Sequence, residues 1–171
     1  MLTPHPVPFP AAAVSSVLRV RSARQDDAAA LAALSRPFVR SGALRERPAS
    51  LYVRQAAEFL VAEAADGTLD GCVALRVHAA SLANGHGPVG VLYNFCVAGH
   101  RQGNGVGARL MTAVLARAGA QSLTALYTAT VGSGGLFLRH GFTPASPRTA
   151  PPAWTRSLDP RRGARVLARF L

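Results

Sequence analysis

The feature that most constrains the fold is a junction where an apolar strand passes through a glycine-rich loop into an amphipathic helix. Val89–Val97 is almost entirely apolar, which predicts a strand buried on both faces. The segment HRQGNGVGARL follows, and apolar residues then recur at helical spacing, which predicts a helix over 104–118. This order of strand, loop and helix favours an α/β domain with the loop at the end of a sheet strand.

Weaker patterns predict the other elements. Strands are expected over 17–20, 58–64, 71–77, 123–128 and 164–171, with a further one starting at 141. Helices are expected from Asp26 until about Pro37, which should end the first of them, and over 49–57 and 134–140. The prolines near the start predict a flexible N-terminal arm over 1–15, followed by one domain over 16–171.

The distribution of charge excludes several kinds of chemistry. Of eight acidic residues, none lies between Asp70 and Asp159, so no carboxylate base or magnesium ligand comes from that stretch. The five histidines have no paired ligand spacing, and we expect no metal site. Cys72 and Cys96 lie in apolar runs and are expected to be buried thiols. A nucleophilic Cys96 is the alternative, although no sequence signature supports it.

The net charge of +11 comes from arginine alone, because the chain has no lysine. The arginines are not interleaved with aromatic residues, which argues against nucleic acid as the partner, and their charge suits an anionic ligand. No apolar run reaches the ~18 residues of a membrane span. The first residues also lack the pattern of a signal peptide, so a cytoplasmic protein is expected.

The glycine-rich loop is a candidate anion site. Gly103, Gly105 and Gly107 allow the backbone to approach a ligand closely, and the N–H groups of the following helical turn favour negative charge. A P-loop needs a lysine, which this chain lacks. A dinucleotide fingerprint needs an acidic residue ~20 positions later, and none is present.

A third phosphate-binding pattern fits better. Gln102-x-x-Gly105-x-Gly107 resembles the acetyl-CoA signature of the GNAT acetyltransferase superfamily, and the order of elements over 17–171 agrees with it. The resemblance implies an α/β (α+β) domain: a mixed, mostly antiparallel sheet of about six or seven strands, splayed in the middle and flanked by about four helices. It implies acetyl-CoA as the cosubstrate. The expected acetyl-CoA contacts are Phe95, Cys96, Val97, Gln102, Gly103, Asn104, Gly105, Val106, Gly107 and Ala108.

The segments SGALRERPASL, FLVAEAADGTLDGCVALR and ARVLARFL are similar to the acetyltransferase domain of N-acetylglutamate synthases. That similarity implies that arginines hold a carboxylate-bearing small-molecule amine such as an amino acid, because a guanidinium fork matches a carboxylate. The expected substrate residues are Arg45, Arg47, Arg162 and Arg165. Two positions depart from the relatives: Val91 stands where synthases often have glutamate, and Phe137 where many family members have a catalytic tyrosine.

The expected reaction is direct attack of a neutral amine on the bound thioester, with the backbone N–H near Val97 polarising the carbonyl. Glu63 is the first choice for the general base, on the expectation that its strand faces the cleft. Glu58, Glu46, a histidine and ordered water remain alternatives. Tyr127 and Ser133 are the expected donors to the leaving thiolate.

Two other functions remain open. The chain could be an acyl-CoA-sensing module without activity, or it could acetylate a protein N-terminus. Edge strands of this architecture often pair between subunits, so we expect a homodimer.

Overall fold

The computed structural model describes residues 18–80 and 87–171, so the predicted arm over 1–15 lies outside it. The described residues form one seven-stranded, mostly antiparallel sheet in the order β1-β2-β3-β4-β5-β7-β6, which confirms the expected fold class. The strands are β1 (Arg19–Ser22), β2 (Phe59–Glu63), β3 (Leu69–His78), β4 (Val89–Val97), β5 (Ala125–Thr130), β6 (Thr143–Pro144) and β7 (Arg165–Phe170).

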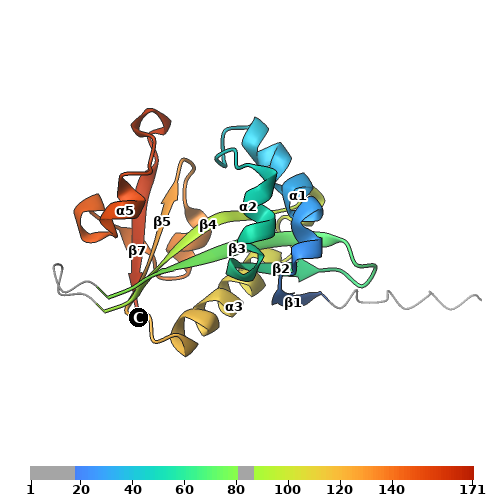
Figure 1. Cartoon of the computed structure of the whole chain (residues 1–171), viewed down its shortest axis with the longest axis horizontal. Helices are drawn as coiled ribbons and strands as arrows, with labels where there is room; N and C mark the ends of the chain where they lie inside the picture. The colour runs from blue at the N-terminus through green and yellow to red at the C-terminus, as the bar shows by residue number, and fades with distance from the viewer. Residues whose placement is uncertain (1–17, 81–86) are drawn as a thin grey trace, which may run out of the picture.

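Helices cover both faces of this sheet. The α-helices are α1 (Ala28–Arg40), α2 (Ala49–Arg54), α3 (Val106–Ala120), α4 (Gly135–Arg139) and α5 (Pro152–Thr155). Figure 1 shows α1 and α2 above strands β2 to β4 and α3 below them. The apolar periodicity of α3 explains this packing, since Val106, Leu110, Met111 and Val114 form one buried face.

The core is divided by the sheet into separate clusters. One cluster joins the buried face of α3 to residues such as Leu60, Val73 and Leu92 on one side of the strands. A second cluster joins Leu31 of α1 to Phe59 and other residues on the opposite side. This alternation follows from the period of two along each strand, which sends successive side chains to opposite faces.

The sheet opens between β4 and β5, its one parallel pair in the described residues. Their pairing runs from Val89↔Ala125 to Val91↔Tyr127 and then stops, although β4 continues to Val97 and β5 to Thr130. The free end of β5 remains paired with β7 as far as Thr130↔Arg165. Figure 1 shows the two strands diverging. The splay expected from the family resemblance is therefore present.

Some element boundaries differ from the sequence-based predictions. Pro37 does not end the first helix, because α1 continues to Arg40. Proline removes one intrahelical hydrogen bond, but the last turn still forms, because the backbone N–H of Ser41 donates to the Pro37 carbonyl. The glycine-rich segment also remains a loop two residues longer than expected, and α3 begins at Val106. The short helix α5 was not expected from the sequence.

Within the described ranges, none of the helices has the length and apolar character needed to cross a membrane.

Candidate functional site

The loop between β4 and α3 is shaped by two glycines with left-handed backbone. Gly103 has φ 79° and Gly105 has φ 80°, a region that side chains disfavour, and Gly105 is the N-cap of α3. The Arg109 N–H donates to the Gly105 carbonyl, so the intrahelical hydrogen bonds begin there. The backbone N–H groups of residues 106–108 precede that bond and point out of the helix terminus, where the helix dipole adds partial positive charge.

Two side-chain contacts hold this loop against the sheet. Gln102 Nε2 donates to the Val97 carbonyl at 3.1 Å, which ties the loop to the end of β4. Arg101 Nε donates at 2.7 Å to Asp70, whose side chain is 3% exposed at the start of β3. Asp70 is thus a structural carboxylate that anchors the loop, and sequence reasoning did not identify it.

A hollow of about 510 Å³ lies in front of the loop, within the ~300–1,000 Å³ typical of ligand pockets. Most of the predicted acetyl-CoA residues line it: Phe95, Cys96, Val97, Gln102, Gly103, Gly105, Gly107 and Ala108. Asn104 and Val106 do not line it, because Asn104 is exposed on the loop and Val106 is buried in the core. Arg101, Arg139 and His140, which sequence reasoning missed, also line it. We call this space the loop hollow.

A second hollow occupies the opening between β4 and β5. Tyr93, Asn94 and Phe95 line it from β4, and residues 128–130 line it from β5. Phe137 of α4 closes one side, at the position where many relatives have a tyrosine. We call this space the cleft.

Two further hollows are lined by three of the four predicted substrate arginines, and we call them the arginine hollows. Arg45 and Arg47 line both of them, together with Tyr93 and Trp154. Arg162 lines the first, and its Nη2 donates to the Gly42 carbonyl at 2.7 Å. The structure therefore brings three of the four predicted arginines together. Asp159 in the first arginine hollow is the one carboxylate among the residues that line these four hollows.

Arg165 has a different environment from the other three arginines. Its Nη2 donates to the backbone carbonyls of Gly132 and Ser133, and its side chain lines none of the four hollows. It holds the loop after β5 against the start of β7.

Arg47 is the arginine with the strongest signature of a ligand contact. Burial lowers the pKa of Arg47, and its Nε is buried without a hydrogen-bond partner among the described residues. Its Cζ lies 4.6 Å from the centroid of the Tyr93 ring, a cation–π arrangement. Nε2 of His78 is likewise buried without a hydrogen-bond partner among the described residues, and His78 lines the second arginine hollow together with Arg47. Burial lowers the pKa of His78. Both atoms can donate to an acidic ligand if His78 carries its proton on Nε2.

Glu58, an alternative base, is already bonded. Tyr93 Oη donates to Glu58 at 2.5 Å, and Arg76 Nε donates to the same carboxylate at 3.2 Å. The pKa of Tyr93 is raised, first by burial and then by this hydrogen bond. Glu58 therefore fixes the ring on which Arg47 stacks and balances the charge of Arg76.

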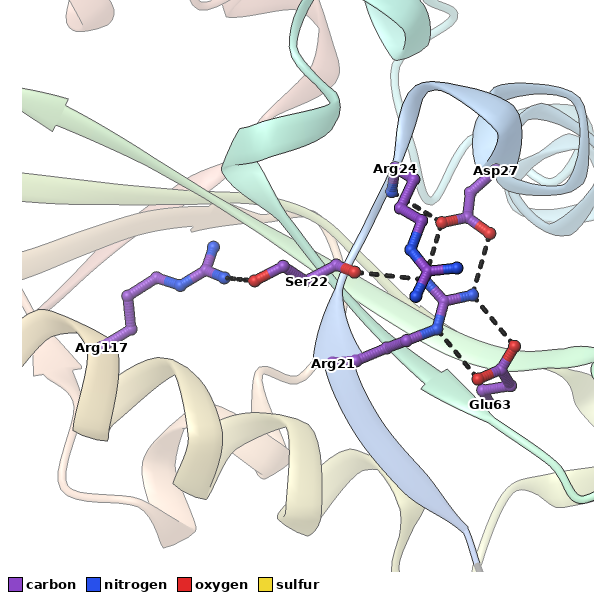
Figure 2. Close-up of polar contacts among 6 residues, drawn as sticks. All are labelled: Arg21, Ser22, Arg24, Asp27, Glu63 and Arg117. Atoms are coloured by element: carbon purple, nitrogen blue, oxygen red, sulfur yellow. Dashed lines mark hydrogen bonds and ion pairs between the residues drawn. The ribbon is translucent and has the colours of Figure 1, made fainter.

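Glu63, the first choice for the base, lies elsewhere. It ends β2, and the whole of β3 separates β2 from β4. Figure 2 shows its carboxylate held by Arg21, which also binds Asp27. The hydrogen bond from Arg21 lowers the pKa of Glu63. Glu63 lines none of the four hollows, so the expectation that it faces the cleft receives no support from its position.

The two predicted hydroxyl donors also have other contacts. Tyr127 is 1% exposed, and its hydroxyl donates to the Thr149 carbonyl at 2.7 Å. Ser133 is exposed after β5, and its Oγ accepts from the Gly135 N–H. Neither residue lines the four hollows.

The two cysteines are buried free thiols, as the apolar runs indicated. Their sulfur atoms lie 3.7 Å apart on paired strands. The pKa of Cys96 is raised well above its usual range, first by its contact with Cys72 and then by burial. A raised pKa leaves little thiolate at neutral pH, which disfavours the nucleophile alternative. Among the described residues, no three metal-ligating side chains gather in a way that could hold an ion.

Known proteins resemble this chain in both sequence and structure. A family model described as an acetyltransferase (GNAT) domain matches residues 55–144. An amino-acid acetyltransferase of Ralstonia nicotianae is 32% identical over 152 residues, which cover 89% of this chain and 32% of that protein. The chain thus spans about a third of the length of this curated relative.

Two solved structures extend the comparison. N-acetylglutamate synthase of Neisseria gonorrhoeae, in complex with coenzyme A and N-acetyl-glutamate, is 26% identical with a TM-score of 0.80, over 92% of this chain and 36% of that chain. A Mycobacterium tuberculosis protein in complex with CoA shares the fold, with a TM-score of 0.69 and 23% identity over 90% and 99% of the two chains. The family model covers more than half of the sequence, and the described strands have the splayed sheet expected for it. This chain belongs to the family of GNAT acetyltransferase domains.

Proposed function

We propose that this chain transfers the acetyl group of acetyl-CoA directly to the amine of a small carboxylate-bearing substrate such as an amino acid. The observation that carries the proposal is the continuity of the hollows along β4. The loop hollow shares Phe38 and Phe95 with the cleft, and the cleft shares Tyr93 and Asn94 with the first arginine hollow. The thioester of acetyl-CoA bound in the loop hollow can therefore meet, in the cleft, the amine of a substrate bound in the first arginine hollow.

The proposed acetyl-CoA site combines the glycine-rich loop with the free edge of β4. The N–H groups at the start of α3 receive the pyrophosphate, and the helix dipole stabilises its charge. The backbone of Phe95, Cys96 and Val97 is not paired with β5, so it can pair with the pantetheine arm. Arg101 and Arg139 add positive charge beside the phosphates.

The proposed acceptor is held through its carboxylate. Arg47 offers a buried Nε that has no partner among the residues that the structure describes, and Arg45 and Arg162 line the same hollow. A carboxylate supplies two oxygens to a guanidinium fork, and burial strengthens that pairing. Arg165 supports the neighbouring loop in this proposal, since its guanidinium already binds two carbonyls. The Ralstonia nicotianae relative, an amino-acid acetyltransferase, agrees with an amino acid as acceptor.

The chemical step needs little from ionisable side chains. The neutral amine attacks the thioester carbon, the N–C bond forms, the C–S bond breaks, and the thiolate regains a proton while the amine loses one. Holding two reactants together supplies up to ~7–11 kcal/mol in well-oriented systems. The positions of Glu63, Tyr127 and Ser133 give no support to roles in proton transfer, which stay predictions. We propose that water accepts the amine proton.

The expected homodimer and the cytoplasmic location likewise stay predictions. A protein N-terminus as acceptor and an inactive sensing module are the competing functions, and the same assay separates them from the proposal.

The test is release of free thiol from acetyl-CoA by the purified chain. The panel contains L-glutamate, L-glutamine, other amino acids, simple alkylamines and a peptide with a free N-terminus. We expect turnover with one or more free amino acids and at least ~tenfold lower kcat/KM with the matching amine that lacks the carboxylate. Turnover of the peptide alone would indicate a protein acceptor. Binding of CoA without turnover of any amine would indicate a sensing module.

A further inference from the structure

Asn94 has an unusual place in β4. It is 3% exposed and has φ 51°, in the left-handed region that asparagine tolerates better than most residues. The strand pairing explains this backbone. Cys72 pairs with Cys96 and Ala74 with Tyr93, so two residues of β4 stand opposite one residue of β3. The bulge places Asn94 where β4 has left β5, at the wall of both the cleft and the first arginine hollow.

The hydrogen bonds around Asn94 determine which way its amide points. Ser35 Oγ donates its one hydrogen to the Leu31 carbonyl at 2.8 Å, so it can only accept from Asn94. The group 2.8 Å from Ser35 must therefore be the Asn94 amide nitrogen, which also lies 3.6 Å from the Cys72 sulfur. The other end of the amide is then the carbonyl oxygen Oδ1.

This oxygen has no partner within the described part of the chain. Asn94 Oδ1 is buried and accepts no hydrogen bond. An unpaired carbonyl in a buried site is unfavourable, and native proteins leave few of them. Because Asn94 lines the cleft and the first arginine hollow, a ligand that reaches their junction can supply the missing donor.

We infer that Asn94 Oδ1 accepts a hydrogen bond from the acceptor amine and orients it for attack on the thioester. This inference rests on the proposed function. One N–H of the amine donates to Oδ1, which leaves the nitrogen lone pair free to form the N–C bond as the C–S bond breaks. Positive charge then develops on the nitrogen, and the fixed carbonyl dipole stabilises it in a site shielded from water. An amide does not take the proton, so Asn94 binds the amine without acting as a base.

The neighbourhood of Asn94 agrees with such a role. Arg47 belongs to the same arginine hollow, so an amino acid bound through its carboxylate brings its amine to the side of β4 on which Asn94 lies. Tyr93, the preceding residue, carries the Arg47 guanidinium on its ring. Tyr93, which supports the proposed carboxylate-binding Arg47, and Asn94, the proposed amine contact, are therefore consecutive residues of one strand.

The test compares variants at position 94 with a variant of its neighbour. Asn94→Gly accepts the left-handed backbone and removes the acceptor oxygen. Ser35→Ala removes the partner of the amide nitrogen and keeps that oxygen. Each is assayed for amine-dependent thiol release with the amino acids of the panel, for amine-independent hydrolysis of acetyl-CoA, and for the Kd of CoA by calorimetry.

We expect Asn94→Gly to lower kcat/KM for the amine by at least about tenfold, the effect of losing one hydrogen bond that strengthens in the transition state. The Kd of CoA and the rate of hydrolysis should remain within about threefold, and Ser35→Ala should have the smaller effect on amine turnover. If Asn94→Gly does not bind CoA, Asn94→Asp carries the test. It keeps an acceptor oxygen and tolerates the same backbone, so it should bind CoA and retain amine turnover.

Asn94→Gly turnover within about twofold of wild type would overturn the inference and leave the proposed function standing. Equal loss of amine transfer and hydrolysis would also overturn it, because the bulge would then serve only to shape the thioester site. An Asn94→Asp protein that binds CoA but transfers to no amine would contradict it as well. If the wild-type chain releases no thiol with any amine of the panel, both the inference and the proposed function are overturned.

Discussion

The guanidinium of Arg47 stacks on the ring of Tyr93, with Cζ 4.6 Å from the ring centroid and Nε without a hydrogen-bond partner in the described chain. Arg76 lies over the same ring at 5.0 Å, but the Glu58 carboxylate balances its charge. The two arginines therefore differ in what they can offer a ligand. Arg47 keeps an unused donor in a partly buried site, whereas Arg76 and Glu58 hold the ring in place.

Arg47→Lys should weaken binding of the amino-acid substrate more than a conserved charge suggests. Lysine loses both the planar stacking and the fork that meets a carboxylate. We expect KM for the amino acid to rise by at least about tenfold with the Kd of CoA unchanged. Arg54→Lys on the exposed side of α2 is the matched control and should behave as wild type. An unchanged KM in Arg47→Lys would remove this residue from the acceptor site.

The glycine-rich loop can be tested with a pair of matched glycines. Gly105 has φ 80° and Gly67 has φ 85°, and an added Cβ at either would meet no atom within 4 Å. Alanine at each position should therefore cost a similar ~1–2 kcal/mol of backbone strain. Only Gly105→Ala should weaken CoA binding, by about tenfold, because the strain falls on the loop that holds the pyrophosphate. Equal affinities by calorimetry would place CoA elsewhere.

The Arg21 cluster should make stability depend on pH. Its hydrogen bonds lower the pKa of Asp27 below the ordinary 3.8 and that of Glu63 below 4.5. The folded chain thus holds these protons less tightly than the unfolded chain, so the stabilisation is complete above about pH 5 and is lost as pH falls through the folded-state values. Arg21→Met should lower Tm at pH 7 and have less effect at pH 3.

The exposed Arg19 on the same strand provides the control for that series. Arg19→Met should leave Tm nearly unchanged at both pH values. A Tm loss in Arg21→Met that is as large at pH 3 as at pH 7 would mean that packing of the arginine stem, rather than its ion pairs, stabilises this corner of the sheet.

Tyr127→Phe should separate stability from activity. The variant removes the hydrogen bond from the Tyr127 hydroxyl to the Thr149 carbonyl, which should cost about 0.5–1.5 kcal/mol of the free energy of unfolding. Turnover of saturated enzyme should stay within about twofold, because the hydroxyl lies outside the four hollows. Tyr52→Phe, whose hydroxyl makes no bond within the described ranges, should lose less stability. Loss of turnover in a stable Tyr127→Phe protein would instead support the Tyr127 hydroxyl as the proton donor to the leaving thiolate.

The acetyl-CoA loop could be predicted from the sequence because its signals are local. A strand pattern, a glycine spacing and a helical periodicity follow one another within one segment, and each has its own physical cause. The predicted contacts from Phe95 to Val97 and from Gln102 to Ala108 accordingly line one hollow, apart from Asn104 and Val106. The arginines were found through their similarity to a family, and three of them share the arginine hollows.

The residues around the chemistry could not be predicted in the same way. The alternation of a strand tells which residues share a face, but not which strands stand between that strand and the cleft. Glu63 was expected at the cleft for this reason, and the strand order puts β3 between them. The bulge at Asn94 depends on a two-for-one pairing with β3, a non-local feature that leaves no mark in the pattern of β4.

The most direct test of the central claim follows the acetyl group itself. Wild-type chain is incubated with acetyl-CoA labelled with carbon-13 in the acetyl group and with the amino acids of the panel, and the products are identified by mass spectrometry alongside free thiol. We predict one labelled N-acetyl amino acid for each thiol released, and a decrease of at least about tenfold in both for Arg47→Lys at low amino-acid concentration. Thiol released with labelled acetate as the sole product, or no labelled amide from any amino acid, would contradict it.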